Sequence, residues 1–589
     1  MTVLDRSLVT DLPFVASPPR AEVALTPGLA ARRRDRRRTR RNISFERFAI
    51  WTLSFALFLV VGWRMAISSG VLPGDALART ANASAALFSR DPHLESIGFV
   101  WPPFPSLWQV LFLPLAKWFP VLLTHGFAGV LVSAALMATM ISTISAWFVD
   151  LGVSPWVRRT LLVLCAVHPF VLAYGANGMS EAGMLCFLVI AARRLALWFE
   201  GHRGLDLATA SVAMGFAYLT RYEVAGAIAV VMGVLAIDSF VRHRGRRHLK
   251  KRIALDLVVG VGPAAFAMVL WAFVSWAVIS EPFAQFSSKY GNSLAAGSIL
   301  NRSLGSASQL DAAKSGIAGA AGSLSGLPRV GFFAQQVLVL GGGAALLFLL
   351  AYLWWGTRSA RRIVAVVAVF GGPLAFQLAS SVRGATFAWG RFAIAAVPIG
   401  VLLAGPVFRE MDTAVRRRIA GVGVVAVVAV SVGASYAMVR AGALQTSDER
   451  GELSAVPGLM GPASAVRRSS MIDAGRQVAE DLARLHLRAG QILTDSASTF
   501  PVILNSSDQR VFVIPADRDF ERTLSDPAAF GVRYLLLPDP RSAGYDSLND
   551  SRATLFDDGA GIAHLVKDWQ LGDAFPHLRL YELDERLRR

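Results

Sequence analysis

The chain has 589 residues, of which 54% are apolar, with a mean hydropathy of +0.47 and a formal net charge of +18. Repeated, largely uncharged apolar runs of about 20 residues are long enough to cross roughly 30 Å of hydrocarbon, which excludes a soluble domain and indicates a polytopic membrane protein. The only two cysteines, Cys165 and Cys186, lie inside apolar runs. We therefore expect them to be packing residues, and we expect neither a disulfide framework nor a cysteine-ligated metal site.

The positive charge is unevenly distributed along the chain. Residues 440–589 hold 18 Lys and Arg against 22 Asp and Glu, so the positive excess lies in the first 439 residues. Nucleic-acid binding is the competing interpretation of such basic clusters, but their alternation with apolar runs favours cytoplasmic loops that follow the positive-inside rule. We expect no nucleic-acid partner and a cytoplasmic amino terminus. The clusters lie at 32–41, 158–159, 193–203, 242–252, 358–362 and 409–418.

The first elements in chain order are a predicted disordered basic tail at 1–47 and a retained first span at 48–67. The long run 205–241 is divided at the charged segment 220–223, because a single helix of 37 residues would be about twice the membrane thickness. Eleven spans are predicted, which leaves the carboxyl-terminal domain on the extracytoplasmic side of the membrane. The further ten lie near 122–148, 160–174, 182–199, 205–220, 223–241, 253–280, 331–355, 363–380, 392–408 and 419–439.

Two outer loops are predicted, at 68–121 and 281–330. The first contains a helix over 76–88 and a mostly apolar piece, 107–118, that follows several prolines. Because about a dozen residues are too few to span the bilayer, we expect this piece to form an interfacial or re-entrant helix. The second loop is rich in Ser, Gly and Ala, a composition typical of a mobile segment.

The carboxyl-terminal region has the pattern of a water-soluble unit. After a linker at 440–464, residues 465–589 show helical spacing at 471–487 and short buried strands at 491–494, 511–514 and 533–538. The predicted fold is an α-helical polytopic membrane protein, with a transmembrane domain at 48–439 and a small extracytoplasmic α/β domain.

Five charged residues stand at the outer ends of the predicted spans. Ionisable groups at a lipid boundary are costly, so several on one predicted side of the membrane indicate a site rather than a surface. These residues are Asp75, Glu181, Arg221, Glu223 and Arg391.

Asp75 follows the first span directly and is the candidate catalytic residue. A carboxylate there can accept a proton from a hydroxyl nucleophile, and partial burial would raise its pKa toward a useful range. The alternative is an Asp that caps the helix beginning at residue 76.

The segment 91–103 is dense in groups that bind sugars. The ring of Trp101 offers a flat apolar face, and Asp91, His93 and Glu95 offer hydrogen bonds. The alternative is a structured interfacial loop whose histidine and acids face water.

The candidate phosphate ligands are cations at the outer boundary. Arg221 can bind a lipid phosphate through a two-pronged contact, with Glu181, Tyr222 and Glu223 orienting it. The alternative is a structural ion pair between Arg221 and one of the two glutamates. Arg391, which opens a late span, and Lys289 in the second outer loop are further candidates for the phosphate, although such residues ordinarily extend toward lipid headgroups.

Together these features resemble the polytopic GT-C glycosyltransferases, such as the protein O-mannosyltransferases and the lipid A aminoarabinose transferases. The resemblance covers roughly residues 48–439. It comprises an acid just after the first span, an interfacial helix, Met179-Ser180-Glu181, Thr220-Arg221-Tyr222-Glu223, Gly390-Arg391-Phe392 and a soluble outer tail.

The resemblance implies inverting transfer of a sugar from a polyprenyl-phosphate donor to a protein, lipid or glycan at the outer face of the cytoplasmic membrane. Asp75 takes the place of the general base, and Arg221 and Arg391 hold the leaving phosphate. Protein O-mannosyltransferases carry paired acids in the first loop, whereas Ala76 follows Asp75 here. Either a lone carboxylate suffices or Asp91 or Glu95 completes the pair, and no metal cofactor is expected.

The sequence is also compatible with two other classes of protein. A transporter or lipid flippase would have ionisable or helix-breaking residues at mid-membrane, for which His125, His168-Pro169 and 260–263 are the candidates, and an internal repeat, which the sequence lacks. A non-catalytic envelope-assembly protein is the third class, because a resemblance in fold does not establish activity.

Overall fold

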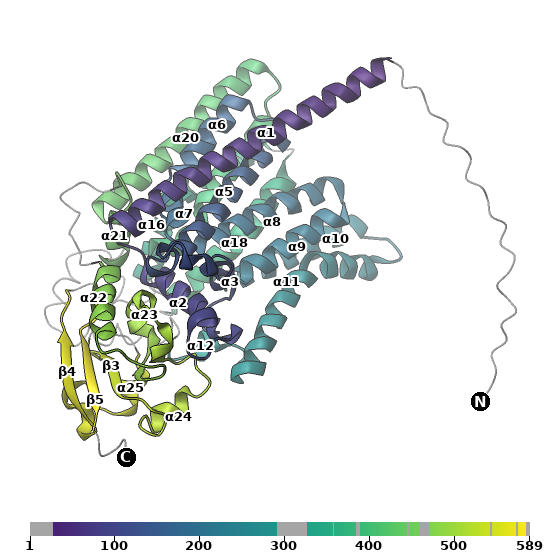
Figure 1. Ribbon diagram of the computed structural model, residues 1–589. Coiled ribbons are helices and arrows are strands. Elements are labelled where there is room, and N and C mark those ends of the chain that lie inside the picture. The colour runs from purple at the N-terminus through teal and green to yellow at the C-terminus, as the bar shows by residue number, and fades with distance from the viewer. Residues whose placement is uncertain are drawn as a thin grey trace, which may run out of the picture. The chain divides into compact units, whose positions relative to one another are not determined.

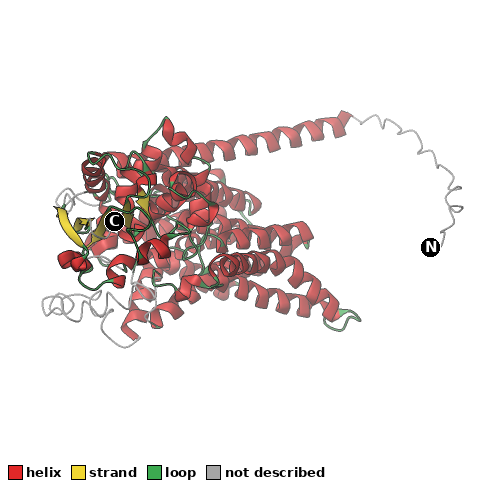
Figure 2. Cartoon of the chain, turned by 60° about the horizontal axis from the view of Figure 1, so that its bottom comes forward, coloured by secondary structure: helices red, strands yellow, loops and turns green. Residues whose placement is uncertain are grey.

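The computed structural model describes residues 27–290, 327–356, 359–383, 389–444, 447–459, 470–541, 545–572 and 575–584. This part of the chain is mostly helical and ends in a small β-sheet (Figures 1 and 2). It divides into two units, Met1–Ala49 and Ile50–Arg589. The contacts described below lie within the second unit.

Nine helical segments of the described chain are long and apolar enough to cross a membrane, and a bent pair of shorter helices meets the same criteria when its two parts are taken together. The chain is therefore a multi-pass membrane protein. The bent pair consists of α6 (Pro155–Ala166) and α7 (Pro169–Ala176), which meet at 64°. The nine segments are Ser44–Ser68 at the end of α1 (Pro27–Trp63), α5 (Phe127–Asp150), α8 (Glu181–Gly201), α10 (Val224–His243), α11 (Leu249–Ile279), Val330–Trp354 with α16 (Leu327–Val337) and α17 (Gly343–Trp355), α18 (Ala360–Val382), Gly390–Arg409 with η5 (Gly390–Ala393) and α19 (Ala396–Ala404), and α20 (Ala414–Ala441).

Ten of the eleven predicted spans correspond to these nine segments and the bent pair, and the eleventh does not. The run predicted at 205–220 forms α9 (Gly204–Tyr218), whose 15 residues, at 1.5 Å each, make a helix about 22 Å long. That is shorter than the hydrocarbon core. The predicted break after this run is confirmed, because α10 begins only at Val224.

The predicted amino-terminal tail is partly helical. Helix α1 begins at Pro27, inside the tail predicted to be disordered, because arginine is a good helix former and the basic run continues directly into the apolar one. Residues 1–26 and most of the predicted second outer loop, 291–326, lie outside the described residues.

Close backbone contacts hold the helices together. A Cβ atom at Gly226 of α10 would lie 2.3 Å from the carbonyl oxygen of Gly372 in α18, so only glycine allows this approach. Small residues at helix interfaces are the usual means of close packing in membranes. Cys165 and Cys186 are buried and free, as expected of packing residues.

The segment between the first two spans folds into short helices. The predicted helix over 76–88 corresponds to α2 (Gly74–Phe88), and η2 (Leu94–Ile97) follows it. The predicted interfacial piece at 107–118 is divided between α3 (Phe104–Val110) and η3 (Leu113–Lys117). It exposes large apolar side chains, as a helix at the lipid boundary does. The exposed large apolar side chains of this piece are Trp108, Leu111, Leu115 and Trp118.

The carboxyl-terminal domain contains a five-stranded sheet in the order β2-β1-β3-β5-β4. The three predicted strands are β1 (Ile492–Thr494), β2 (Phe512–Val513) and β3 (Tyr534–Pro538), which pair in parallel. Two antiparallel strands were not predicted, β4 (Ala563–Trp569) and β5 (Leu578–Leu583). The helices are α22 (Met471–Ala483), α23 (Ser496–Asn505), α24 (Phe520–Ser525), α25 (Ser547–Ser551) and α26 (Leu555–Asp558).

The sheet domain lies at one end of the helix bundle, next to α2 (Figure 1). The Ser470 hydroxyl donates to the carbonyl oxygen of Gly70 at 2.7 Å, and the Ser84 hydroxyl donates to Oε1 of Gln509 at 3.2 Å. We call this the sheet end of the bundle. It is the end at which the first span passes into α2.

Candidate functional site

A cavity of about 150 Å³ opens at the sheet end of the bundle. Its walls come from α2, the segment before α3, the beginning of α8, the turn between α9 and α10, the short helix α12 (Ala284–Ser287), α18 and η5. The lining residues are Asp75, Arg79, Val100, Trp101, Pro102, Ser180, Thr220, Arg221, Tyr222, Glu223, Gln285, Phe376, Gln377, Ser380, Arg391 and Phe392.

Asp75 lies in the first turn of α2, and its carboxylate pairs with Arg391. The cap residue of α2 is Pro73 and no side chain caps the helix, so the capping alternative for Asp75 is wrong. Oδ2 of Asp75 lies 3.0 Å from Nη2 of Arg391, with 34% of the Asp75 side chain exposed and 5% of the Arg391 side chain. The guanidinium of Arg391 also stacks on the ring of Trp389 at 3.9 Å.

The charge state of Asp75 follows from its neighbours. Burial opposes ionisation, but Arg391, Arg79 and Arg221 outweigh it and lower the pKa of the carboxyl below its usual value. This direction is opposite to the one predicted from burial alone. Asp75 is therefore ionised at neutral pH.

Arg221 pairs with both of its predicted glutamate partners. Its Nη1 lies 2.5 Å from Oε1 of Glu181, and its Nε lies 2.5 Å from Oε1 of Glu223. Glu181 is fully buried in the first turn of α8, and its Oε1 lies 3.9 Å from Nε of Arg391. The same glutamate thus stands between two arginines and fixes both guanidinium groups at the cavity wall.

Arg79 belongs to the site and was missed at the sequence level. It is 5% exposed, its guanidinium lies 4.9 Å from the centre of the Trp101 ring, and its Nη1 donates to Sδ of Met179 at 3.5 Å. Burial lowers its pKa. The available signal was its spacing of four residues from Asp75, which places both side chains on one face of α2.

A second residue missed at the sequence level, Glu449, positions the backbone of Arg391. Its carboxylate accepts hydrogen bonds from the backbone amides of Gly390 at 2.7 Å and Arg391 at 2.9 Å, and from the hydroxyl of Tyr174 at 2.9 Å. Burial raises the pKa of Glu449 to about 7 although these donors favour the ionised form, and burial likewise raises the pKa of Glu452 to about 8.

These two glutamates lie in α21 (Ser447–Ser454), within the segment predicted to be a linker. That prediction needs correction, because the segment supplies a buried contact of the site. No local sequence pattern marks this contact, and only the folded chain shows that Glu449 reaches the start of η5.

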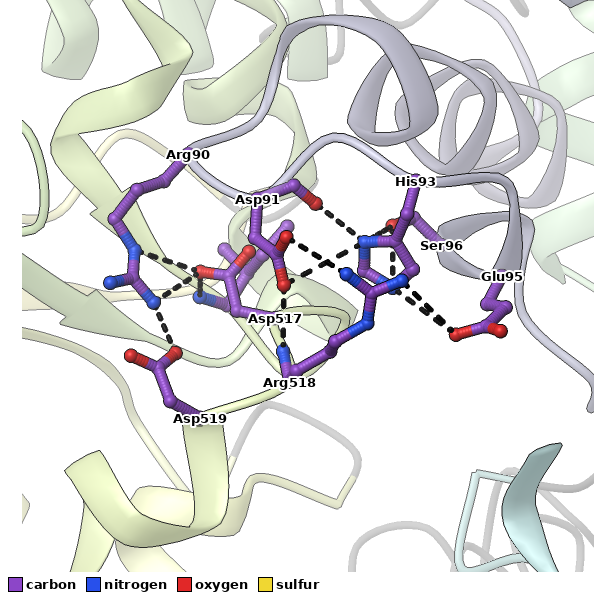
Figure 3. A network of polar contacts seen from close by, with 9 residues as sticks. Arg90, Asp91, His93, Glu95, Ser96, Asp517, Arg518 and Asp519 are labelled. Atoms are coloured by element: carbon purple, nitrogen blue, oxygen red, sulfur yellow. Dashed lines mark hydrogen bonds and ion pairs between the residues drawn. The ribbon is translucent and has the colours of Figure 1, made fainter.

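The predicted sugar-binding residues Asp91, His93 and Glu95 do not line the cavity. Figure 3 shows that they face the sheet domain and surround Arg518. The backbone amide of Arg518 donates to Oδ2 of Asp91 at 3.2 Å, and its Nη2 lies 3.8 Å from Oε2 of Glu95. His93 lies between the two acids, 3.8 Å from each. The prediction of substrate binding is corrected, because these groups bind the carboxyl-terminal domain.

Arg90, which precedes this segment, forms the second half of the same interface. It pairs with Oδ2 of Asp517 at 3.3 Å and with the carboxylate of Asp519 (Figure 3). Asp517 is 1% exposed, and burial raises its pKa to about 6. Trp101 is the one predicted residue of this segment that does line the cavity.

Lys289 also lies away from the cavity, so its predicted role as a phosphate ligand is corrected. Its Nζ lies 2.9 Å from Oδ2 of Asp550 and 4.9 Å from the centre of the Tyr545 ring, both in the sheet domain. The hydroxyl of Tyr290 next to it lies 2.7 Å from both Oδ2 of Asp495 and Oγ of Ser547. The polar groups of this segment hold it against the sheet domain.

The structure gathers the remaining predicted residues in one place. The hydroxyl of Tyr222 donates to the carbonyl oxygen of Val100 at 2.5 Å, and this bond links the α9–α10 turn to the segment before α3.

Neither a protein-family model nor a curated protein matches this sequence. The predicted residues that line the cavity are Asp75, Trp101, Arg221, Tyr222, Glu223 and Arg391, with Glu181 behind Arg221.

Proposed function

We propose that the protein is a membrane glycosyltransferase, which transfers a sugar from a polyprenyl-phosphate donor to a hydroxyl group of a protein, lipid or glycan. The observation that carries the proposal is a partly exposed carboxylate, Asp75, beside buried guanidinium groups in a cavity at the end of membrane-spanning helices. The resemblance of the sequence to GT-C enzymes supports the same reaction. The arrangement of basic segments favours the extracytoplasmic face of the cytoplasmic membrane for this cavity.

In the proposed step, the acceptor oxygen attacks the anomeric carbon from the side opposite to the phosphate. The bond between that carbon and the phosphate oxygen breaks, and its electron pair leaves with the phosphate. The acceptor proton passes to the carboxylate of Asp75, and the single displacement inverts the anomeric centre. Arg391 and Arg221 lie where fixed cations can stabilise the negative charge that grows on the leaving phosphate.

The ion pair between Asp75 and Arg391 has a role in this scheme. A donor phosphate that binds Arg391 competes with Asp75 for the same guanidinium. Because the phosphate then neutralises part of the positive charge of Arg391, this arginine lowers the pKa of Asp75 less. The pKa of Asp75 rises, and the carboxylate becomes a stronger base when the donor is present. Glu181 and Glu223 keep Arg221 in place throughout.

The experiment that tests this proposal replaces Asp75 with Asn in the full-length chain. Sugar transfer to endogenous acceptors in membranes is expected to fall by roughly 10²- to 10⁴-fold, the usual contribution of a general base. The variant is expected to accumulate polyprenyl-phosphate sugar, which mass spectrometry of the copurified lipid detects.

The matched control is Glu480→Gln, an exposed acid of α22 outside the cavity. Its transfer activity is expected to equal that of the wild type. Unchanged transfer by the Asp75→Asn variant, at normal protein abundance, contradicts the assignment of Asp75 as the base.

A further inference from the structure

Two glutamines line the same cavity, and among the described residues neither side-chain amide has a protein partner. Gln285 is 9% exposed and Gln377 is 5% exposed, and both belong to the cavity wall. Within the described part of the chain, neither amide takes part in a hydrogen bond with another residue. Their side chains are largely buried but neither amide is among the enclosed polar atoms that lack a partner, so the amides open onto the cavity. Two such amides at one cavity can bond with a polar molecule that enters it.

The two glutamines come from elements that are distant in sequence. Gln377 lies on α18, between Phe376 and Ser380 of the cavity wall. The hydroxyl of Ser380 donates its hydrogen bond to the carbonyl oxygen of Phe376 at 3.0 Å. Gln285 lies on the short helix α12, which follows α11. A ligand that reaches both amides is therefore held between α12 and α18.

The chemistry of the wall selects the kind of group that fits. A side-chain amide donates through its nitrogen and accepts through its oxygen, which matches hydroxyl groups that do both. The two carboxylates that line the cavity, Asp75 and Glu223, are each already paired with an arginine. Among the described residues, the wall thus offers no further carboxylate to a cationic amino group, because Glu223 is held by Arg221 and Asp75, once the phosphate competes for Arg391, takes the acceptor proton in the proposed step.

We propose that Gln285 and Gln377 form the sugar-recognition subsite, and that this subsite takes an uncharged sugar rather than an amino sugar. This inference rests on the proposed function, because it assigns the glycosyl part of the same lipid-phosphate donor. The arginines hold the phosphate, and the glutamines hold the hydroxyl groups of the sugar on it.

The experiment measures binding of three probes to the full-length protein in nanodiscs. They are bare polyprenyl phosphate, polyprenyl phosphate carrying an uncharged sugar (mannose, glucose, galactose or arabinose, each in turn), and polyprenyl phosphate carrying an amino sugar. The wild type is expected to bind one of the uncharged forms more tightly than the other two probes. Gln285→Ala and Gln377→Ala are each expected to weaken binding of that form by roughly 3- to 10-fold, the value of a neutral hydrogen bond, without changing the affinity for bare lipid.

Two further variants sharpen the test. Gln477→Ala, an exposed glutamine of α22, is the control and is expected to bind all probes like the wild type. Gln377→Glu places a carboxylate at the subsite and is expected to shift the preference toward the amino sugar, a change that a purely structural role of Gln377 does not produce.

The possible failures are distinguishable. If bare polyprenyl phosphate does not bind the wild type, the proposed function fails and this inference fails with it. If bare lipid binds but the sugar adds nothing, if the amino sugar is preferred, or if the alanine variants weaken all probes equally, only the subsite proposal is overturned.

Discussion

The carboxylate of Asp75 lies 3.0 Å from the guanidinium of Arg391, although 316 residues separate the two in the chain. The arginine is the fixed partner, because its side chain is 5% exposed and its backbone amide is held by Glu449. The aspartate faces the cavity with a third of its side chain exposed. The pair therefore joins an anchored cation to a carboxylate that a ligand can reach.

The first prediction concerns the pH dependence of transfer in an Arg391→Gln variant. Among the cations around Asp75, Arg391 lowers its pKa the most, so its removal raises that pKa. In the proposed reaction, sugar transfer needs ionised Asp75, so activity is expected above the pKa of Asp75 and is expected to be lost as the pH falls through that value. The acid limb of the profile of kcat/KM against pH is therefore expected to move to higher pH in the variant.

Arg221→Gln is the matched comparison, because Arg221 contributes least among the three cations that lower the pKa of Asp75. Its acid limb is expected to move less than that of Arg391→Gln, although both variants lose donor affinity. Equal shifts, or no shift for Arg391→Gln, would show that the ion pair does not set the ionisation of Asp75.

The second prediction concerns the stability of a Glu449→Gln variant at different pH values. The pKa of Glu449 is raised from its ordinary value of 4.5 to about 7 by burial, so between these values the folded state binds a proton that the unfolded state has released. The stability that this proton contributes is present at low pH and is lost as the pH rises through about 7. Glutamine does not titrate.

Relative to the Glu449→Gln variant, the wild type is therefore expected to lose thermal stability between about pH 5 and pH 8. Thermal unfolding of both proteins in the same detergent across this range gives the comparison. A difference in melting temperature that stays constant with pH is incompatible with a titrating Glu449.

The third prediction compares two arginines at the interface with the sheet domain. Arg90→Ala leaves Asp517, which is 1% exposed, without its cation, and an uncompensated buried charge of this kind costs about 3 kcal/mol. The side chain of Arg518 is 61% exposed, and an exposed ion pair contributes less than about 1 kcal/mol. Arg90→Ala is expected to loosen the sheet domain far more than Arg518→Ala.

Limited proteolysis of the two variants measures this difference, with cleavage between the bundle and the sheet domain as the readout. Faster cleavage of Arg518→Ala than of Arg90→Ala would reverse the assignment of the stronger contact.

The periodic elements of this fold could be predicted from the sequence, whereas few of its tertiary contacts could. Apolar runs predicted the membrane segments, and compact apolar stretches predicted β1 and β3, because burial on all sides leaves a local pattern. The central residues of β4 are exposed, so that edge strand has no apolar pattern to detect.

Some residues of the candidate site could likewise be predicted from the sequence, and others could not. Asp75 and Arg391 were predicted as candidates because a charged residue at the end of an apolar run can be recognised from the sequence alone. Asp91, His93 and Glu95 have the same conspicuous polarity, but they bind the sheet domain, and no local pattern distinguishes a ligand site from an interface between domains. Glu449 was missed for the converse reason, because its burial arises only when α21 meets the start of η5.

The last prediction concerns Lys289, whose charge and place in the predicted second outer loop made it a candidate phosphate ligand. Its side chain is 62% exposed and is engaged by Asp550 and the ring of Tyr545 in the sheet domain. Lys289→Ala is therefore expected to bind bare polyprenyl phosphate in nanodiscs like the wild type. Arg391→Lys is expected to bind it more weakly, because an ammonium cannot reproduce the two-pronged contact of a guanidinium with phosphate. If Lys289→Ala weakens lipid binding as much as Arg391→Lys does, the phosphate site extends to the segment around Lys289 and the assignment to the cavity is wrong.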